Sequence, residues 1–441
     1  MPFLDRRSPR FRRVLAAVPV AAALALSGCS VPTGNARVDP AEASGDGTLR
    51  IGLILDNEGQ GSFLNKAQLA AAKLAVQEIN GAGGHKGRPV ELLPESVGQD
   101  TAGQARALVD ADADVVIGPT DSSRATAAID VLSRSKILLI SPANTAAGLS
   151  AYNSGGFYFR TAAADVAQGG ALAKLALEGG AKRVAVIHEA GDYGQDVAES
   201  ASSAVTSSGA ETVATAEFTA GNAAAAVAQV KAAGPEVVIV VARGGAQGAL
   251  SELHNAGISG EKLVLSDGAV RQYGAELGSK ALSGARGILP GVFPSAHFQG
   301  ELVAMDSGLK DMTFAAETYD AVNLAAIAAA AAEDDAGSSM AAWLTTVSGG
   351  FRAGVATAAV GGSAAGGSAA GGSVADFAEC ASYKECIDGL RAGRTPDYQG
   401  QSGAINFDAN GDITSANYMV FTYGGDNRAE LSGSQAVAKS G

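Results

Sequence analysis

The sequence contains few aromatic residues, few charged residues and few cysteines. Aromatic residues make up 5% and charged residues 17% of the 441 residues, and there are only 3 Cys and 1 Trp. Because 47% of the chain is hydrophobic, a disordered chain is excluded. With 58 Gly and abundant Ala, the helices must pack through small side chains. A chain of this length is expected to form two to three domains of ordinary size.

The motifs of common enzyme classes are also missing. The sequence contains no G-x-S-x-G and no H-E-x-x-H, and the Gly-rich loop 56–62 lacks the Gly-Lys-Ser/Thr of a phosphate-binding loop. The four histidines lie apart from any Cys or Ser nucleophile motif and are interpreted as structural or surface residues; they are His85, His188, His254 and His297. We therefore expect no enzyme, no cofactor and no metal, with an exported hydrolase as the enzymatic alternative.

The first 28 residues have the pattern of an export signal. Five arginines precede an apolar run, Val14 to Leu26, that is too short to span a bilayer comfortably. The sequence Leu26-Ser27-Gly28-Cys29 resembles a bacterial lipobox, in which Cys29 would carry the lipid and begin the mature chain. A plain secretory signal or a single membrane anchor are the alternatives. Residues 29–47, rich in Ala, Gly, Pro and Asp, are expected to form a tether.

Charge and the remaining cysteines restrict the partners further. Removing the signal's net charge of +4 from the total of −13 leaves −17, which disfavours nucleic acid and anionic membranes. In an exported protein, Cys380 and Cys386 are expected to form a disulfide. The alternative, a metal site, lacks nearby histidines.

The stretch from Ala113 to Thr145 predicts a βαβ unit. Val115–Ile117 and Ile137–Ile140 have the pattern of buried parallel strands, and Arg124–Ser135 places its apolar side chains on one helical face. Polar residues follow both strands, at the edge where open α/β sheets bind ligands.

These polar residues predict an anion site. Ser122 and Ser123 lie at a helix start, whose free N–H groups and hydroxyls suit a carboxylate. The alternative is that Asp121 and Ser122 only cap the helix.

After Asp165 a second series of strands and helices begins. Its expected strands are Val184–His188, Glu211–Phe218, Val237–Val241 and Leu263–Leu265. The sequence therefore predicts an α/β protein of two doubly wound, Rossmann-like lobes joined by a hinge. Residues 355–374 are Gly/Ala/Ser repeats and are expected to form a flexible insert.

The C-terminal part is expected to hold a helix at Cys380–Leu390 and a last strand at Tyr418–Tyr423. Between them, the stretch from Asp408 to Asp412 is expected to form a turn around Asn410-Gly411. A calcium loop is the alternative there, but the spaced acids and the closing Glu are absent.

Several motifs together resemble one known family. They are Gly118-Pro119-x-x-Ser122-Ser123, Ser141-Pro142-Ala143-Asn144-Thr145 and Tyr319-Asp320-Ala321-Val322. They resemble the branched-chain amino-acid-binding (leucine/isoleucine/valine-binding) proteins, which are type 1 periplasmic binding proteins and substrate-binding lipoproteins of ABC importers. The resemblance covers Leu49–Tyr423 apart from the insert. It implies that 48–163 and 294–405 form lobe 1, and that 164–293 and 406–430 form lobe 2.

The resemblance also implies a set of ligand contacts. Ser122, Ala143 (through its backbone) and Thr145 match the family's contacts to the carboxylate and ammonium groups. Tyr193 matches a tyrosine that closes over the ligand, with partial core burial as the alternative. Asp267 falls where the family carries an acid for the ammonium, with a helix cap as the alternative.

The chain departs from the family in the side-chain pocket. Arg243-Gly244-Gly245 stands where leucine binders carry an aromatic residue, and Phe63 or Leu64 stands where a tryptophan is common. Gly244 would leave space and Arg243 would offer charge, so a larger, polar or acidic ligand fits this pattern.

The function implied is that of a monomeric solute receptor, lipid-anchored on the extracytoplasmic face of the cell membrane. It would bind an amino acid or a related small polar solute between its lobes and deliver it to ABC permease subunits. The alternative is a sensor of the same fold that feeds a signalling partner.

Overall fold

The structure is a computed structural model that describes residues 36, 42–56, 58, 63–97, 100–350 and 377–438. The expected signal 1–28, Cys29, most of the tether and the insert 355–374 lie outside the described residues. Within the described part of the chain, we find no helix with the length and apolarity needed to cross a membrane.

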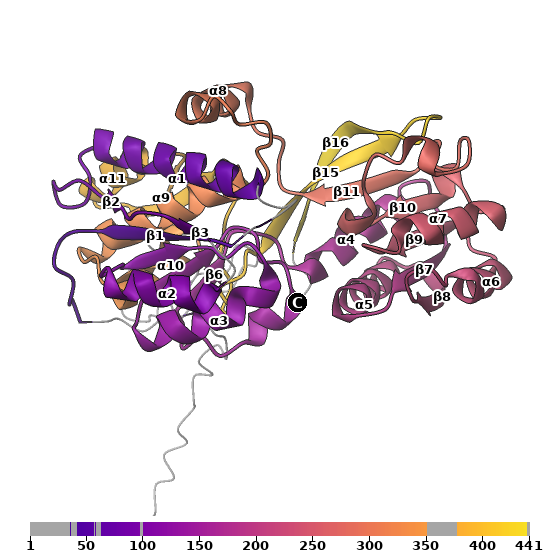
Figure 1. The fold of residues 1–441 in the computed structure, drawn as a ribbon, viewed down its shortest axis with the longest axis horizontal. Helices are drawn as coiled ribbons and strands as arrows, with labels where there is room; N and C mark the ends of the chain where they lie inside the picture. Colours follow the sequence, from indigo (N-terminus) through magenta and orange to yellow (C-terminus); the bar gives the residue numbers. More distant parts are fainter. Residues whose placement is uncertain are drawn as a thin grey trace, which may run out of the picture. The chain divides into compact units, whose positions relative to one another are not determined.

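The first sheet is parallel, with strand order β2-β1-β4-β5-β6 and with β3 also paired to β1. Its strands are β1 (Arg50–Leu55), β2 (Glu91–Leu92), β3 (Ser96–Val97), β4 (Val115–Ile117), β5 (Leu138–Ser141) and β6 (Tyr158–Arg160). The accompanying helices are α1 (Phe63–Gly81), α2 (Thr101–Asp110), α3 (Ser122–Arg134), the 3₁₀ turn η2 (Ala147–Ala151), α8 (Ala296–Met305), α9 (Ala315–Ala332) and α10 (Gly337–Val347). Helices α1 and α9, far apart in sequence, lie side by side (Figure 1).

Successive residues of these strands enter two different cores. In β4, Val115 and Ile117 pack with α1, α9 and α10, whereas Val116 packs with α2 and α3. The sheet is therefore covered on both faces, as the apolar character of its strands predicts. Helix α9 is almost wholly buried and consists mostly of alanine, which confirms packing through small side chains.

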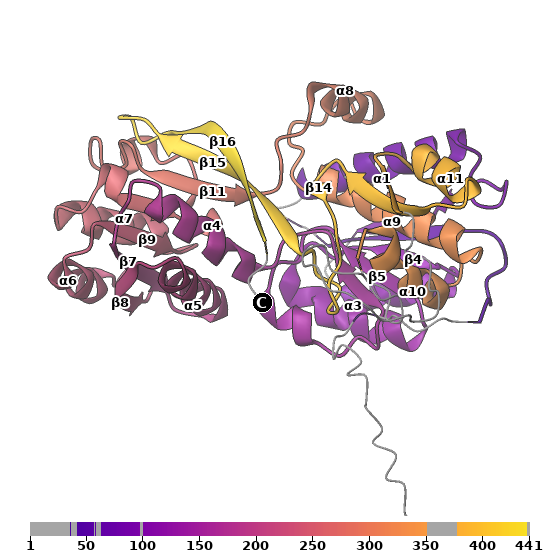
Figure 2. The same ribbon diagram turned by 180° about the vertical axis from the view of Figure 1, so that it is seen from behind.

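The second sheet has the order β16-β15-β11-β10-β9-β7-β8, in which β15 runs antiparallel to both of its neighbours, β11 and β16 (Figure 2). Its strands are β7 (Arg183–Glu189), β8 (Glu211–Phe218), β9 (Val237–Val241), β10 (Leu263–Leu265), β11 (Arg286–Pro290), β15 (Ser415–Tyr423) and β16 (Ala429–Ala438). Helices α4 (Asp165–Leu177) and α5 (Asp192–Ser207) cover one face, and α6 (Ala224–Ala233) and α7 (Ala246–Asn255) cover the other. Short 3₁₀ turns follow at η3 (Gly260–Lys262), η4 (Asp267–Ala269) and η5 (Gly274–Glu276).

The chain passes between the two sheets after β6, after β11 and after β14. Both sheets are doubly wound, so the predicted α/β class with two lobes is confirmed.

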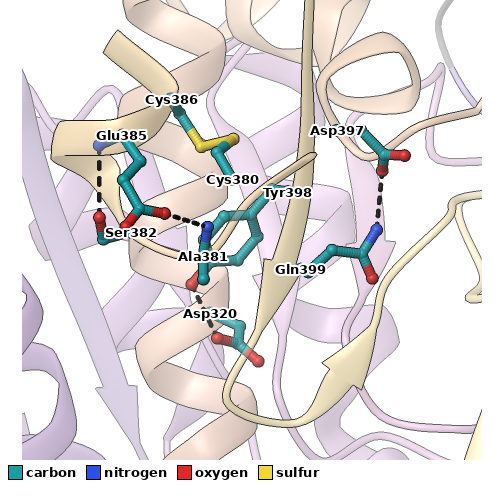
Figure 3. Close-up of a disulfide and its surroundings, with 9 residues drawn as sticks. All are labelled: Asp320, Cys380, Ala381, Ser382, Glu385, Cys386, Asp397, Tyr398 and Gln399. Carbon is teal, nitrogen blue, oxygen red and sulfur yellow. Dashed lines mark hydrogen bonds between the residues drawn. A yellow bond between two sulfur atoms is a disulfide. The ribbon is translucent and has the colours of Figure 1, made fainter. Parts of the chain in front are cut away.

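A small third sheet carries the disulfide. It consists of β12 (Phe377–Cys380), β13 (Thr395–Gly400) and β14 (Gly403–Ala404), beside α11 (Tyr383–Arg391). Cys380 and Cys386 are bonded, as expected, with their Cα atoms 5.2 Å apart (Figure 3). Tyr398 of β13 donates a hydrogen bond to the buried Asp320 of α9, which ties this sheet to the first lobe.

Two expected elements of the C-terminal part differ. Cys380 ends a strand instead of starting a helix, because Ser382 caps α11 by accepting a hydrogen bond from the N–H of Glu385. Tyr418–Tyr423 lies in the last strand but one, since β16 pairs with it along its whole length. The sequence of β16 consists mostly of small and polar residues, so it lacks the apolar pattern by which a strand is predicted.

Candidate ligand-binding site

The loop after β4 is fixed to the loop after β1. Asp56, which directly follows β1 and is buried, accepts a hydrogen bond from the N–H of Thr120 at 3.1 Å. Gln68 of α1 donates to the Thr120 hydroxyl at 2.7 Å. Burial raises the pKa of Asp56, although the Thr120 N–H opposes this shift.

Asp121 and Ser122 have different roles in this loop. Asp121 is the N-cap of α3, because its carboxylate accepts hydrogen bonds from both the N–H (2.9 Å) and the hydroxyl (2.8 Å) of Ser123. The Ser122 hydroxyl instead accepts from the N–H groups of Thr145 (3.1 Å) and Ala146 (3.3 Å). The capping interpretation therefore holds for Asp121 only, and Ser122 joins the loops that follow β4 and β5.

The loop after β5 is braced from within. Ser141 Oγ donates to the carbonyl of Pro119 and accepts from the N–H groups of Ala143 (3.3 Å) and Asn144 (3.0 Å). A ligand contact through the Ala143 N–H would therefore share this donor with Ser141. Thr145 is half-buried, and its carbonyl accepts a 2.7 Å hydrogen bond from the N–H of Asp165, where α4 begins.

A buried ion pair supports this loop. Arg160 of β6 and Asp412 are both fully buried and lie 2.6 Å apart. The Arg160 guanidinium also donates to the carbonyls of Asn144 (3.2 Å) and Ala146 (2.9 Å). Because Asp412 is engaged by Arg160, this carboxylate serves the chain itself, which argues against a calcium loop here.

In the second lobe, Tyr193 and Asp267 meet directly. Tyr193 Oη lies 2.5 Å from Asp267 Oδ1 and 2.9 Å from Ser266 Oγ. Burial, and next the charge of Asp267, raise the pKa of the Tyr193 hydroxyl well above its ordinary value, so it remains a donor at neutral pH. Tyr193 is half-buried and packs against the core, as the alternative expects, while its hydroxyl reaches from α5 to the residues that follow β10.

Asp267 caps no α-helix. Only short 3₁₀ turns follow it, and its Oδ1 accepts the N–H of the next residue, Gly268, at 2.7 Å. Its own N–H donates to Gln168 of α4 at 3.3 Å. A second acid, Asp165, lies close by and is buried; burial, and next the charge of Asp267, raise its pKa to about 6.

Arg243 extends over this cluster. Its guanidinium carbon lies 3.8 Å from the centre of the Tyr193 ring, and one guanidinium nitrogen lies 3.8 Å from Asp165. A Cβ at Gly244 would meet only Glu189, at an ordinary 3.8 Å, so this glycine is not sterically required. Gly268 differs, because a Cβ there would lie 2.5 Å from Arg243 Cγ and 2.6 Å from the backbone carbonyl oxygen of Ala242.

The structure thus assembles two groups of predicted residues. Ser122, Ser123, Ala143 and Thr145 lie in the adjoining loops of the first lobe, and Tyr193, Arg243, Gly244 and Asp267 lie at strand ends and on α5 of the second.

Sequence reasoning missed Gln168 and Ser266, which hold Asp267 and Tyr193. The position of Gln168 one turn after Asp165 on α4 was an available signal. Glu317 of α9 was also missed. It lines a small cavity with Thr145, Thr161 and Gly291, and burial raises its pKa to about 7.

Within the described parts of the chain, no group of three His, Cys, Asp or Glu residues could hold a metal ion. The two groups instead offer hydroxyls and N–H groups on one lobe, and carboxylates, a tyrosine and one guanidinium on the other. Such a combination of groups is typical of sites for small polar solutes.

Comparison with known proteins places the chain among binding proteins for small solutes. A family profile described as "Periplasmic binding protein" matches residues 48–372. The Leu/Ile/Val-binding protein homolog 3 of Brucella melitensis is 32% identical over 224 residues, which is 49% of this chain and 60% of that protein's length.

Two solved structures share the fold. A branched-chain amino acid transporter substrate-binding protein of Streptococcus pneumoniae, in complex with isoleucine, has a TM-score of 0.57 at 22% identity and covers 89% of this chain and 99% of its own. A transporter substrate-binding protein of Desulfitobacterium hafniense, in complex with Leu, has a TM-score of 0.58 at 20% identity and covers 87% and 100%. The chain belongs to the periplasmic binding protein family, and it is a binding protein, not an enzyme.

Proposed function

We propose that the chain is the extracytoplasmic receptor of an ABC importer and binds an α-amino acid or a closely related polar solute. The ligand lies between the two lobes, which close on it by a hinge, and it then passes to the permease subunits. A lipid on Cys29 holds the receptor at the membrane.

The observation that carries this proposal is the chemical contrast between the two groups of loops. The first lobe offers the Ser122 hydroxyl and the N-terminus of α3, which suit a carboxylate. The second offers Asp267 beside Tyr193, which suits an ammonium. An α-amino acid carries both groups, and the relatives' names and bound ligands, leucine and isoleucine, support the same class.

Ligand binding by the full-length chain, purified in detergent, tests the proposal. Leucine or isoleucine at about 100 times its Kd should stabilise the protein by about 2.7 kcal/mol, which raises its melting temperature. Asp267→Asn should weaken binding by about a hundredfold or more, since the ammonium would be buried without its counter-charge. Asp110→Asn on α2, an exposed carboxylate, is the matched control. If Asp267→Asn binds the ligand with unchanged affinity, the ligand's ammonium group does not contact Asp267.

Localisation tests the anchor separately. Cys29→Ser should move the protein from the membrane to the soluble fraction, since acyl chains supply the anchoring energy. Cell fractionation with an antibody against the chain measures this. A variant that stays with the membrane would contradict lipidation at Cys29 and would leave the ligand site unaffected.

A further inference from the structure

The backbone around Arg243 is held firmly at the end of β9. The N–H of Arg243 donates to Glu189 Oε2 at 2.7 Å, and the N–H of Gly245 donates to Glu189 Oε1 at 2.9 Å. One carboxylate thus clamps the loop on both sides of Gly244. The starting point of the Arg243 side chain is therefore fixed.

The side chain itself is fixed by its neighbours. A Cβ added at Gly268 would lie only 2.5 Å from Arg243 Cγ, so the glycine leaves room for the aliphatic part of the arginine side chain. Its guanidinium lies over the Tyr193 ring at 3.8 Å, a favourable cation–π contact. Arg243 is therefore positioned over the same tyrosine that binds Asp267.

The guanidinium group of Arg243 has N–H donors that are available to a ligand. Its closest carboxylate, Asp165, is 3.8 Å away, whereas a charge-assisted hydrogen bond measures about 2.7–2.9 Å. No hydrogen bond within the described residues uses its side-chain N–H groups, and the side chain is 55% exposed. Arg271 of the same lobe differs: it also stacks on a tyrosine, Tyr273, but donates to Gln247 at 3.0 Å and to Glu276 at 3.1 Å.

We infer that Arg243 binds an anionic group of the ligand other than its α-carboxylate, so that the receptor prefers acidic amino acids. This inference rests on the proposed function and specifies its ligand class. A guanidinium binds a carboxylate through two parallel hydrogen bonds, which gives geometric specificity. Asp267 and Arg243 then bind the opposite charges of one ligand from the same lobe.

The expected preference for acidic amino acids arises because ligands with a neutral side chain bind poorly. A neutral side chain would cover Arg243 when the site closes and leave its donors unpaired. Sites with unpaired buried polar groups reject such ligands strongly. The buried Asp165 balances part of the charge, but its distance leaves the guanidinium donors available.

Calorimetry with matched ligand pairs tests the inference on the full-length chain in detergent. Glutamate should bind at least about tenfold more tightly than glutamine, and aspartate should exceed asparagine likewise. Arg243→Met should weaken binding of the acids by about tenfold to a hundredfold and bring each acid and its amide to similar affinity. Arg243→Lys should retain part of the preference, because it keeps the charge and loses the planar fork. Arg271→Met, the matched control, should leave both ratios unchanged.

The outcomes separate this inference from the proposed function. If leucine, glutamine or asparagine binds wild type as tightly as the acids, or if Arg243→Met keeps the preference for acids, the inference is wrong and amino-acid binding stands. If none of these amino acids binds wild type, the proposed ligand class itself fails and the inference fails with it.

Discussion

The two groups of loops in the candidate site present different polar groups to a ligand. In the first lobe, Ser122 and Thr145 are joined through a hydroxyl and an N–H group, Asp121 caps α3 beside them, and the buried ion pair Arg160–Asp412 supports the loop after β5. In the second lobe, the charged side chains themselves form the surface, with Asp267 beside Tyr193 and Arg243 above.

This difference predicts different sensitivities. The internally bonded loops of the first lobe depend on the scaffold that holds them, so mutations there should change stability and affinity together. A charged cluster at the surface should respond to pH and to single changes of charge, with less effect on folding.

The largest effect is expected at the buried ion pair Arg160–Asp412, which supports the loop after β5. Arg160→Met leaves Asp412 buried without its counter-charge and removes the donors to the carbonyls of Asn144 and Ala146. We expect a loss of about 3–5 kcal/mol in the free energy of unfolding, measured by denaturant titration.

The matched control is Arg134→Met, which breaks an exposed pair on α3, Arg134–Asp130. Because exposed pairs contribute little, this change should alter stability by less than about 1 kcal/mol. Equal losses in the two variants would show that the buried pair has no special role in holding the first lobe.

The two lobes also differ in how far the sequence could predict them. The first-lobe site was visible because Ser122 and Thr145 lie within one βαβ unit, where strand ends and the helix start place them locally. The second-lobe residues come from separate helices and strand ends, so Tyr193 was predicted through the family resemblance alone. Asp267 was predicted from the resemblance together with its position directly after a buried strand.

Contacts distant in sequence explain most of what was missed. Gln168 meets Asp267 across 99 residues, and nothing in the local pattern of either residue announces this hydrogen bond. The requirement for glycine at position 268 comes from the Arg243 side chain and the Ala242 carbonyl, which belong to another loop. Strand β16 was missed because its alternating burial is weak and its order comes from pairing with β15.

A smaller effect is expected at Ser122. Ser122→Ala removes the acceptor of the Thr145 and Ala146 N–H groups together with a candidate ligand donor. We expect a loss of about 1–3 kcal/mol in ligand binding, with a measurable drop in melting temperature of the empty protein.

Ser123→Ala is the neighbouring control, because the Ser123 hydroxyl bonds only to the exposed Asp121 in the described contacts. Calorimetry and thermal unfolding of both variants measure the difference. If Ser123→Ala weakens binding more than Ser122→Ala does, the assignment of the first-lobe donor is wrong.

The smallest expected effect is a pH dependence of ligand affinity, which distinguishes the second lobe from the first. Burial and the charge of Asp267 raise the pKa of Asp165 to about 6, while Arg243 opposes this shift. An ammonium ligand favours the ionised form of Asp165, so affinity should be complete above this pKa and fall as the pH drops through it. Between pH 7.5 and pH 5, binding of a neutral amino acid should weaken by up to about tenfold.

Folding stability should change in the opposite direction over this range. Because the folded pKa of Asp165 exceeds its ordinary value, protonation favours the folded state, and this contribution is lost as pH rises through about 6. Asp165→Asn should therefore flatten the pH dependence of leucine binding measured by calorimetry and slightly raise stability at pH 7.5. Thr145→Val, a change in the uncharged first-lobe loop, should keep the slope while lowering affinity at every pH. A slope that survives in Asp165→Asn would assign the titration to another carboxylate, of which Glu317, with a pKa raised to about 7 beside Thr145, is the next to test.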